Sequence, residues 1–321
     1  SLVAKTESNP PEKRPIARAI GAPFKNSRVS LAKAKALCKV HAILPQEDFM
    51  FKLLPECIPC AFSGCLRTLR AARASKDIEL ATLKEAARLV AEFDFESSAP
   101  ALGQAIQRLV RKNTKNDDPY KSAKTFSNET MKNLLPKMRQ SVAKSKDPLL
   151  AAFLFSALAN RIDFGPGGFS AEQLEELFFS GQELEFGKNM YAQLKEELKK
   201  ASDVVFLLDN AGEIVADSLI IEMLKQNVTA IVRGLPTIND ATMDDIHEAG
   251  IEDICRFLHT ADDLPGIPQD LPQEAEDKLR KADLIISKGQ GNFETMQGRG
   301  LPVYYLLMAK CGPVANCLGV E

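Results

Sequence analysis

The feature that most constrains the fold is a change of hydrophobic period near residue 200. Beyond it, helical patterns such as EIVADSLIIEMLKQ separate four short segments that are apolar on both faces: DVVFLL (203–208), VTAIV (228–232), DLIIS (283–287) and VYYLLM (303–308). Apolar strands that alternate with helices are typical of a parallel sheet covered on both sides. We therefore predict a doubly wound, mostly parallel α/β/α domain over residues 201–321. The segment 255–275 has too little periodicity to predict an element.

Residues 50–200 instead show the period of amphipathic helices. In KDIELATLKEAARLVAEF, apolar side chains from Ile78 to Phe93 recur at three- and four-residue steps. Similar stripes occur in APALGQAIQRLVRK, NETMKNLLPKMRQSVA and PLLAAFLFSALANRI, and Ser170 with Gln173 is typical of a capping box before AEQLEELFFSGQ. The fold class predicted is α/β, with a helical N-terminal domain at 50–200.

The charge balance excludes a strongly basic protein. The 321 residues include 41 Lys and Arg and 43 Asp and Glu, a formal charge of −2. No apolar run approaches the roughly 18 residues that span a bilayer. We expect no nucleic-acid or membrane partner. Seven cysteines, an odd number in a long chain, favour reduced thiols and a cytoplasmic location.

The first 49 residues differ from the rest in charge. They carry nine basic and four acidic residues, a net of +5, which leaves −7 for the remaining 272. Their Pro, Gly and Ser punctuation and lack of amphipathic period predict a basic leader or linker at 1–49. A processed, tagged or over-extended start and an organelle transit segment are the open interpretations of this stretch.

Polar residues follow each predicted strand of the second half. Ligands of doubly wound sheets bind beyond the carboxyl ends of the strands, and parallel strands bring these loops to one rim. Oxygen donors expected at this rim are Asp209, Asn210, Glu213 and Asp240. Carboxylate and amide oxygens suit Mg²⁺, Mn²⁺ or a similar divalent ion.

Cations are expected at the same rim. Arg233 follows the second strand, Lys288 and Asn292 belong to the glycine-containing KGQGN after the third, and Lys310 follows the fourth. Cations and close backbone N–H groups suit a phosphate, so the set indicates metal-assisted phosphoryl chemistry. The alternative is helix capping, which Asp209 or Asn210 could serve alone.

Six motifs together resemble one family. PECIPC, DPY (118–120), ANRIDFG (159–165), DNAGE (209–213), RGLPTIND (233–240) and KGQGNFE (288–294) are similar to the metal-dependent damage-control phosphatases. This family was first catalogued as a domain of unknown function and includes a human protein once described as an acidic-residue methyltransferase. The resemblance runs from about Leu53 to the C-terminus. The CxxC of Cys57 and Cys60 resembles the archaeal and bacterial branch.

The resemblance implies a helical domain beside a doubly wound domain, and a phosphatase acting on small phosphorylated metabolites with Mn, Mg, Co or Ni. Its motifs place Asp209, Asn210 and Asp240 on metal ligands, with Asp209 and Asp240 catalytic. They place Glu213, Asn292 and Lys310 at the substrate or phosphate site, to which the rim loops add Arg233 and Lys288. Asp209 either ligates the metal or also attacks phosphorus.

Three further sets of residues have more than one interpretation. Cys57 and Cys60 are a possible redox pair or metal ligands, or thiols packed on an early helix. Asp118, Tyr120 and Asn128 either make turns and caps or line a pocket at the domain interface, and the same holds for Asn160 and Asp163.

Two other functions are compatible with the sequence. A doubly wound sheet permits an S-adenosylmethionine-dependent carboxyl methyltransferase, but DNAGE stands where the glycine-rich turn of that class is expected. A non-catalytic metabolite-binding module is the third hypothesis. The sequence leaves the oligomeric state open.

Overall fold

A computed structural model of the chain describes residues 37–42, 51–160, 171–179, 185–186 and 190–319, and Leu37–Glu321 form one compact unit. The strands are β1 (Leu37–Ala42), β2 (Glu185–Phe186), β3 (Asp203–Leu207), β4 (Asn227–Val232), β5 (Arg256–His259), β6 (Leu284–Lys288) and β7 (Val303–Leu307). The helices of the first half are α1 (Cys57–Ala71), α2 (Lys76–Glu92), α3 (Ala99–Thr114), α4 (Lys121–Lys144), α5 (Pro148–Ala159), α6 (Ala171–Phe179) and α7 (Tyr191–Leu198). Those of the second half are α8 (Glu213–Met223), α9 (Met243–Ala249), α10 (Gln273–Lys281), α11 (Gln290–Met296) and α12 (Gly312–Leu318).

The described strands form one sheet in the order β2-β1-β7-β6-β3-β4-β5. Strands β7, β6, β3, β4 and β5 are parallel, and β1 runs antiparallel beside β7. The chain leaves β3 toward β4 on one side and reaches β6 on the other, so the strand order reverses at β3. This reversal is the topological switch point, beyond whose carboxyl edge doubly wound proteins bind ligands.

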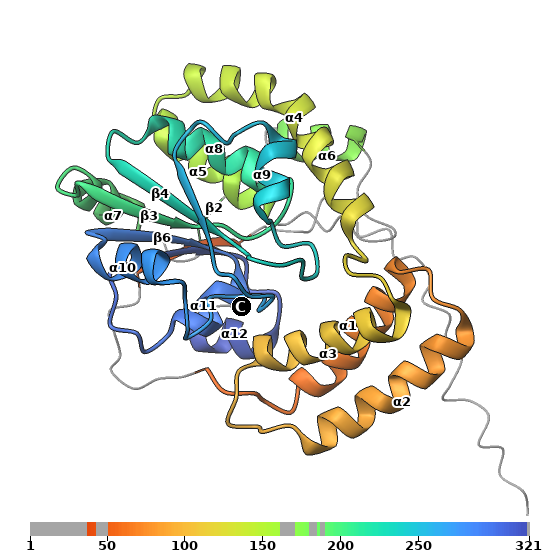
Figure 1. Cartoon of the computed structure of the whole chain (residues 1–321). Coiled ribbons are helices and arrows are strands. Elements are labelled where there is room, and N and C mark those ends of the chain that lie inside the picture. Colours follow the sequence, from red (N-terminus) through yellow and green to blue (C-terminus); the bar gives the residue numbers. More distant parts are fainter. Residues whose placement is uncertain (1–36, 43–50, 161–170, 180–184, 187–189, 320–321) are drawn as a thin grey trace, which may run out of the picture. The chain divides into compact units, whose positions relative to one another are not determined.

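Both faces of the sheet are covered, as the apolar strands require. Val204 and Phe206 of β3 belong to a core built with helices α4 to α9, while Val205 and Leu207 belong to a second core with α10, α11 and α12. Figure 1 shows α8 and α9 on one face of the sheet and α10, α11 and α12 on the other. Because successive side chains of a strand face opposite sides, a strand buried on both faces has no polar alternation. The predicted α/β fold is confirmed.

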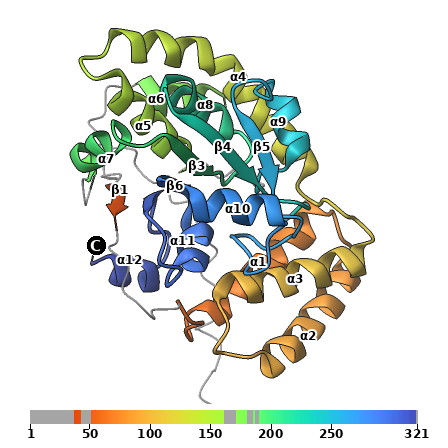
Figure 2. The ribbon, with the colours of Figure 1, turned by 60° about the vertical axis from the view of Figure 1, so that its left-hand side comes forward.

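Helices α1, α2 and α3 have a core of their own, which includes Leu69, Val90 and Ile106. Ser75 and Ser98 cap α2 and α3 by accepting hydrogen bonds from backbone N–H groups of the first turns. Figures 1 and 2 show the three helices together on the side toward which the parallel strands point. Ion pairs from Arg108 and Arg111 of α3 to Asp263 fix this group to the loop after β5.

Several local predictions can be compared with these elements. The four strands predicted by sequence match β3, β4, β6 and β7. Strand β5 lies in the segment for which no element was predicted, and β1 lies inside the stretch 1–49 predicted to be a leader or linker. Ser170 of the expected capping box lies outside the described residues. Helices α4 and α5 pack on α8, which lies against one face of the sheet. The domain boundary near residue 200 stays a prediction.

Candidate active site

A short bridge between two loops assembles the candidate site at the carboxyl end of β3. The Ala241 N–H donates to the Asp209 carbonyl at 2.8 Å, and the Ala211 N–H donates to the Asn239 carbonyl at 2.9 Å. Asn210 and Asp240 form the isolated β-bridge between these bonds. The bridge brings the DNAGE and IND segments together although about 30 residues separate them in sequence.

Two carboxylates and two amides form the centre of the site. Asn160, the last residue of the α5 region, donates from Nδ2 to Asp209 Oδ2 at 3.0 Å and to both Glu213 oxygens at 2.9 and 3.1 Å. Asn210 Nδ2 donates to Asp209 Oδ2 at 2.6 Å and to Glu213 Oε2 at 2.8 Å. Each amide therefore joins the two carboxylates, and all four side chains are buried.

Arg233 lies on the other side of Asp209. Its Nε donates to Asp240 Oδ2 at 2.6 Å, and its Nη2 lies 3.6 Å from Asp209 Oδ1. The guanidinium is buried, and Nη1 and Nη2 have no hydrogen-bond partner among the described residues. Buried N–H donors are rarely left unpaired, so a bound group that accepts hydrogen bonds would complete this site.

Burial is the first cause of an unusual titration at Asp209, raising the pKa of its carboxyl to about 7. The charges of Glu213 and Asp240 contribute to this rise in pKa, while Lys310 and Arg233 oppose it. Burial raises the pKa of Asp240 as well, against the opposing charge of Arg233. A site with this excess of buried carboxylates favours a cation among its oxygens.

The donor set fits a hard divalent ion. Asp209 and Asp240 supply carboxylate oxygens, and the two carboxylates that hold the Asn210 nitrogen turn its amide oxygen away from themselves. No group of three or more His, Cys, Asp or Glu side chains positioned for a metal ion occurs within the described ranges. Two carboxylates and an amide oxygen suit ions such as Mg²⁺ or Mn²⁺, which take one or two protein carboxylates and keep several waters.

The KGQGN segment places Gly289 directly beside the carboxyl group of Asp209. The φ of Gly289 is +78°, and a Cβ at this position would overlap the carboxyl group of Asp209. Only a residue without a side chain allows the turn after β6 to approach Asp209 so closely.

The predicted phosphate-binding residues occupy three different surroundings. Lys288 is fully buried, and its Nζ donates hydrogen bonds to Ser156, Glu213 and Asp217. Asn292 donates from Nδ2 to the carbonyl groups of Leu208 and Lys288, and its buried Oδ1 has no partner among the described residues. Lys310 is exposed, and its positive charge lowers the pKa of both Asp209 and Asp240.

Residues of the helical half brace the site through protein contacts. Asp118 Oδ1 accepts from the Tyr120 N–H at 3.1 Å, and Asp118 pairs with the buried Lys124 at 3.0 Å. Asn128 Oδ1 accepts from the Gly212 N–H at 2.6 Å. The hydrogen bond from the Tyr120 N–H to Asp118 is typical of a turn. A role of DPY in turns and caps is one of the two interpretations given from the sequence. Asp163 lies outside the described residues.

Ser156 and Asp217 are not among the residues predicted from sequence. Both are fully buried, and Ser156 Oγ donates to Asp217 Oδ1 at 2.5 Å. A signal for Asp217 was present, because it is a charged residue four positions after Glu213 and lies between apolar residues such as Ile214, Val215 and Leu219.

The CxxC pair lies at the start of α1. Cys57 is half-buried and Cys60 is exposed. Burial raises the pKa of the Cys57 thiol, with smaller contributions from Glu294, Cys311 and Cys60. A raised pKa disfavours the reactive thiolate, and the redox or metal role of this pair stays a prediction.

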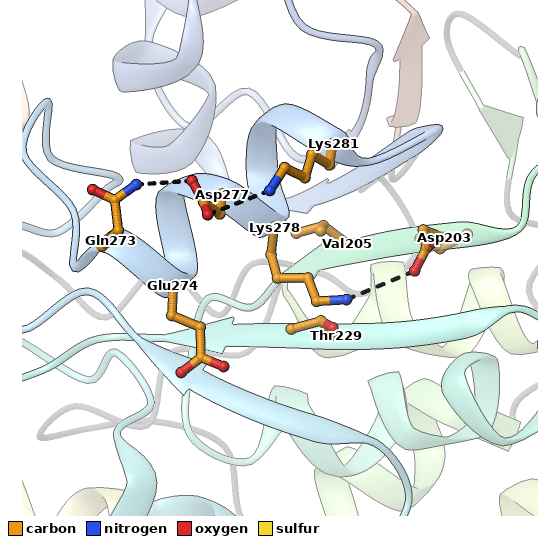
Figure 3. Close-up of a pocket in the computed structure, with 9 residues that line it drawn as sticks. Asp203, Val205, Thr229, Gln273, Glu274, Asp277, Lys278 and Lys281 are labelled. Carbon is orange, nitrogen blue, oxygen red and sulfur yellow. Dashed lines mark hydrogen bonds and ion pairs between the residues drawn. The ribbon is translucent and has the colours of Figure 1, made fainter.

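A cavity of about 600 Å³ lies elsewhere, between α10 and the sheet (Figure 3). Asp203 and Lys278 meet there at 3.7 Å, and Thr229 lies beside them. Asp203 begins β3 whereas Asp209 follows its end, so roughly 20 Å of strand separates this cavity from the candidate site. We assign no role to the cavity.

The fold and site define a doubly wound α/β protein with an acidic, arginine-containing centre at its switch point. Residues 53–321 match the model of the damage-control phosphatase ARMT1-like domain, and the chain belongs to this family.

Two archaeal relatives are named damage-control phosphatases, which supports a phosphatase role. The chain is 32% identical to the one from Archaeoglobus fulgidus over 84% of its own length and 96% of the relative. It is 33% identical to one from Pyrococcus horikoshii, over 84% and 95% of the two chains. The crystal structure of a DUF89 family protein from Pyrococcus horikoshii aligns with a TM-score of 0.76 and 31% identity, covering 84% of this chain and 96% of the other.

No helix of the described ranges has the length and apolarity needed to cross a membrane.

Proposed function

We propose that the chain is a divalent-metal-dependent phosphatase that hydrolyses small phosphorylated metabolites. The observation that carries the proposal is the buried guanidinium of Arg233, which lies beside Asp209 and Asp240. Its Nη groups have no hydrogen-bond partner among the described residues. An arginine with free N–H groups recognises phosphate oxygens, and buried carboxylates beside it hold a cation. The names of the archaeal relatives support the same chemistry.

Each residue of the centre has a part in this proposal. Asp209, Asn210 and Asp240 would hold the ion, which when bound neutralises charge on the phosphoryl oxygens and helps to orient the attacking group. Arg233 would bind two phosphoryl oxygens and stabilise their charge in the transition state. Lys310 at the open edge and the amide of Asn292 would complete the phosphate site.

The role of Asp209 has two forms, which one experiment separates. In the first, Asp209 only ligates the ion. In the second, its carboxylate oxygen attacks phosphorus, the bond from phosphorus to the alcohol oxygen breaks, and water later hydrolyses the aspartyl phosphate. Rapid quenching during turnover, followed by mass spectrometry of the peptide that contains Asp209, detects a phosphoaspartate only for the second form.

The proposal is tested by release of inorganic phosphate from sugar phosphates, nucleotides and phosphopantetheine. Chelator-treated enzyme should be inactive, and Mn²⁺, Co²⁺, Ni²⁺ or Mg²⁺ should restore hydrolysis of at least one compound. Asp209→Ala should abolish both metal binding and hydrolysis. The matched control is Arg256→Met, because Arg256 is an exposed residue of β5 far from the site.

Other experimental outcomes would refute the site or favour one of the alternative functions. Substantial hydrolysis by Asp209→Ala would refute the site. Bound metal without phosphate release would favour a binding module, and methyl transfer from S-adenosylmethionine would favour a methyltransferase. We also propose a cytoplasmic location, with which the free thiols of Cys57, Cys60 and Cys65 agree.

A further inference from the structure

Lys288 occupies a position that differs from that of a phosphate-binding lysine. It is the last residue of β6, directly before Gly289, which lies against Asp209, and its side chain is fully buried. Its Nζ lies 2.5 Å from Glu213 Oε1, 2.8 Å from Asp217 Oδ1 and 2.6 Å from Ser156 Oγ. An ammonium group has three N–H donors, and these three acceptors use all of them. No donor of Lys288 is left for a phosphoryl oxygen.

The charge of this cluster explains why Lys288 stays in place. Burial alone would lower the pKa of Lys288, but the carboxylates of Asp217 and Glu213 outweigh it and raise the pKa above its ordinary value. A buried ammonium between two carboxylates is held strongly, since its removal would leave both carboxylates without their compensating charge.

Glu213 connects this cluster to the candidate site. Its Oε1 accepts from Lys288 and Asn160, and its Oε2 accepts from Asn160 and Asn210. The same two amide nitrogens donate to Asp209 Oδ2. A continuous chain of hydrogen bonds therefore runs from Lys288 through Glu213 and the two amides to Asp209.

We propose that Lys288, anchored by Asp217 and Ser156, is a positioning residue that acts through Glu213 on Asp209, and does not bind the phosphate. The proposal rests on the phosphatase function inferred above. With Lys288 present, Glu213 stays a fixed acceptor for the nitrogens of Asn160 and Asn210. Those amides then keep one orientation, which fixes the Asp209 carboxylate and turns the Asn210 oxygen toward the proposed ion.

Phosphate affinity separates this role from direct phosphate binding. Lys288→Met should lower kcat for p-nitrophenyl phosphate about 10- to 100-fold, the range typical when a residue that orients a ligand is removed. The dissociation constant of inorganic phosphate, measured by calorimetry with Mn²⁺ present, should change less than about threefold, because no contact to phosphate is lost. Ser156→Ala and Asp217→Asn should give the same pattern with smaller losses of kcat.

Two further variants calibrate the measurement. Arg233→Met should weaken phosphate binding by about tenfold or more, since it removes the proposed phosphate contact. Lys281→Met, which removes an exposed lysine of α10 that pairs with Asp277, should match the wild type in both quantities. Circular dichroism and thermal melting establish that each variant is folded. If Lys288→Met does not fold, the same two quantities, kcat and the dissociation constant of phosphate, are compared in Ser156→Ala.

The inference is overturned if Lys288→Met weakens phosphate binding as much as Arg233→Met, or if kcat is unchanged in both Lys288→Met and Ser156→Ala. Absence of hydrolysis by the wild type with every metal would instead refute the proposed function. In that case the phosphate affinities of Lys288→Met and Arg233→Met still distinguish the two roles of Lys288, because binding is measured without turnover.

Discussion

The side-chain oxygen of Asn128 in α4 accepts a hydrogen bond of 2.6 Å from the backbone N–H of Gly212, in the turn that carries Asp209 and Asn210. The other end of the amide donates to Asp245 and Glu248 at 3.2 and 3.3 Å. One side chain from the helical half therefore holds the turn after β3 against the α9 region.

Replacing Asn128 should affect both stability and activity. Asn128→Ala leaves the Gly212 N–H without its acceptor, which costs about 1–3 kcal/mol for a buried group. The turn loses its support, so kcat should fall about tenfold or more. Denaturant unfolding and steady-state kinetics measure the two effects. Lys132→Met is the matched control, because Lys132 also joins α4 to Glu248 but does not contact the turn; equal losses in both variants would contradict the assignment.

Gly289→Ala should abolish most of the activity. The added Cβ would overlap the Asp209 carboxyl group and displace it, and a misplacement of about 1 Å can cost roughly 100-fold in rate. Gly300→Ala is a close control, since Gly300 also has a positive φ, of +63°, but a Cβ there meets no atom within 4 Å. Gly289→Ala should also lose more stability than Gly300→Ala, because its Cβ overlaps Asp209 in addition to the backbone strain of a positive φ. An active Gly289→Ala enzyme would show that Asp209 is not held in the observed position.

Asp263 should contribute strongly to stability. It is buried and pairs with Arg108 and Arg111 of α3, and Gln104 of the same helix donates to it at 2.6 Å. Asp263→Asn keeps the shape but removes the carboxylate that pairs with Arg111 and the shorter of the two carboxylate contacts of Arg108, which keeps Asp262 at 3.7 Å. The free energy of unfolding should fall by about 2–4 kcal/mol. Glu274→Gln breaks the pair with Arg256, in which both side chains are more than half exposed. It should cost less than about 1 kcal/mol.

Glu294 should make stability depend on pH. Burial raises the pKa of its carboxyl to about 7, and the hydrogen bond from Gln290 opposes this only in part. The folded state thus binds the proton more tightly than the unfolded state. The stabilisation is complete below the unfolded pKa of about 4.5 and is lost as the pH rises through about 7.

Glu294→Gln removes this titration. At pH 8.5 the variant should be more stable than the wild type by about 3 kcal/mol, which corresponds to the rise in pKa. The difference should shrink toward zero at pH 4.5. Chemical denaturation at both pH values measures it, with the exposed Glu129→Gln as the control. A constant difference across this range would refute the assignment.

The strands and the candidate ligands could be predicted from sequence because both depend on local pattern. An apolar run such as DVVFLL has no polar face, so it must be buried on both sides in a sheet. The residues after parallel strands must meet at one rim, and this rule alone predicts that Asp209, Asn210, Arg233 and Asp240 are neighbours. Strand β5 was missed because its four residues, Arg256 to His259, are polar at both ends and only partly buried.

The contacts of individual side chains depended on tertiary structure. Lys288 ends one strand of the sheet and Arg233 directly follows another. The ammonium of Lys288 uses all its donors in hydrogen bonds, whereas the Nη groups of Arg233 have no hydrogen-bond partner among the described residues. The difference comes from Ser156 and Asp217, which lie on α5 and α8. No local pattern relates them to KGQGN, since packing of helices on the sheet brings them to Lys288. Sequence thus determined which chemical groups reach the rim, and tertiary packing decided which of them remain available to a ligand.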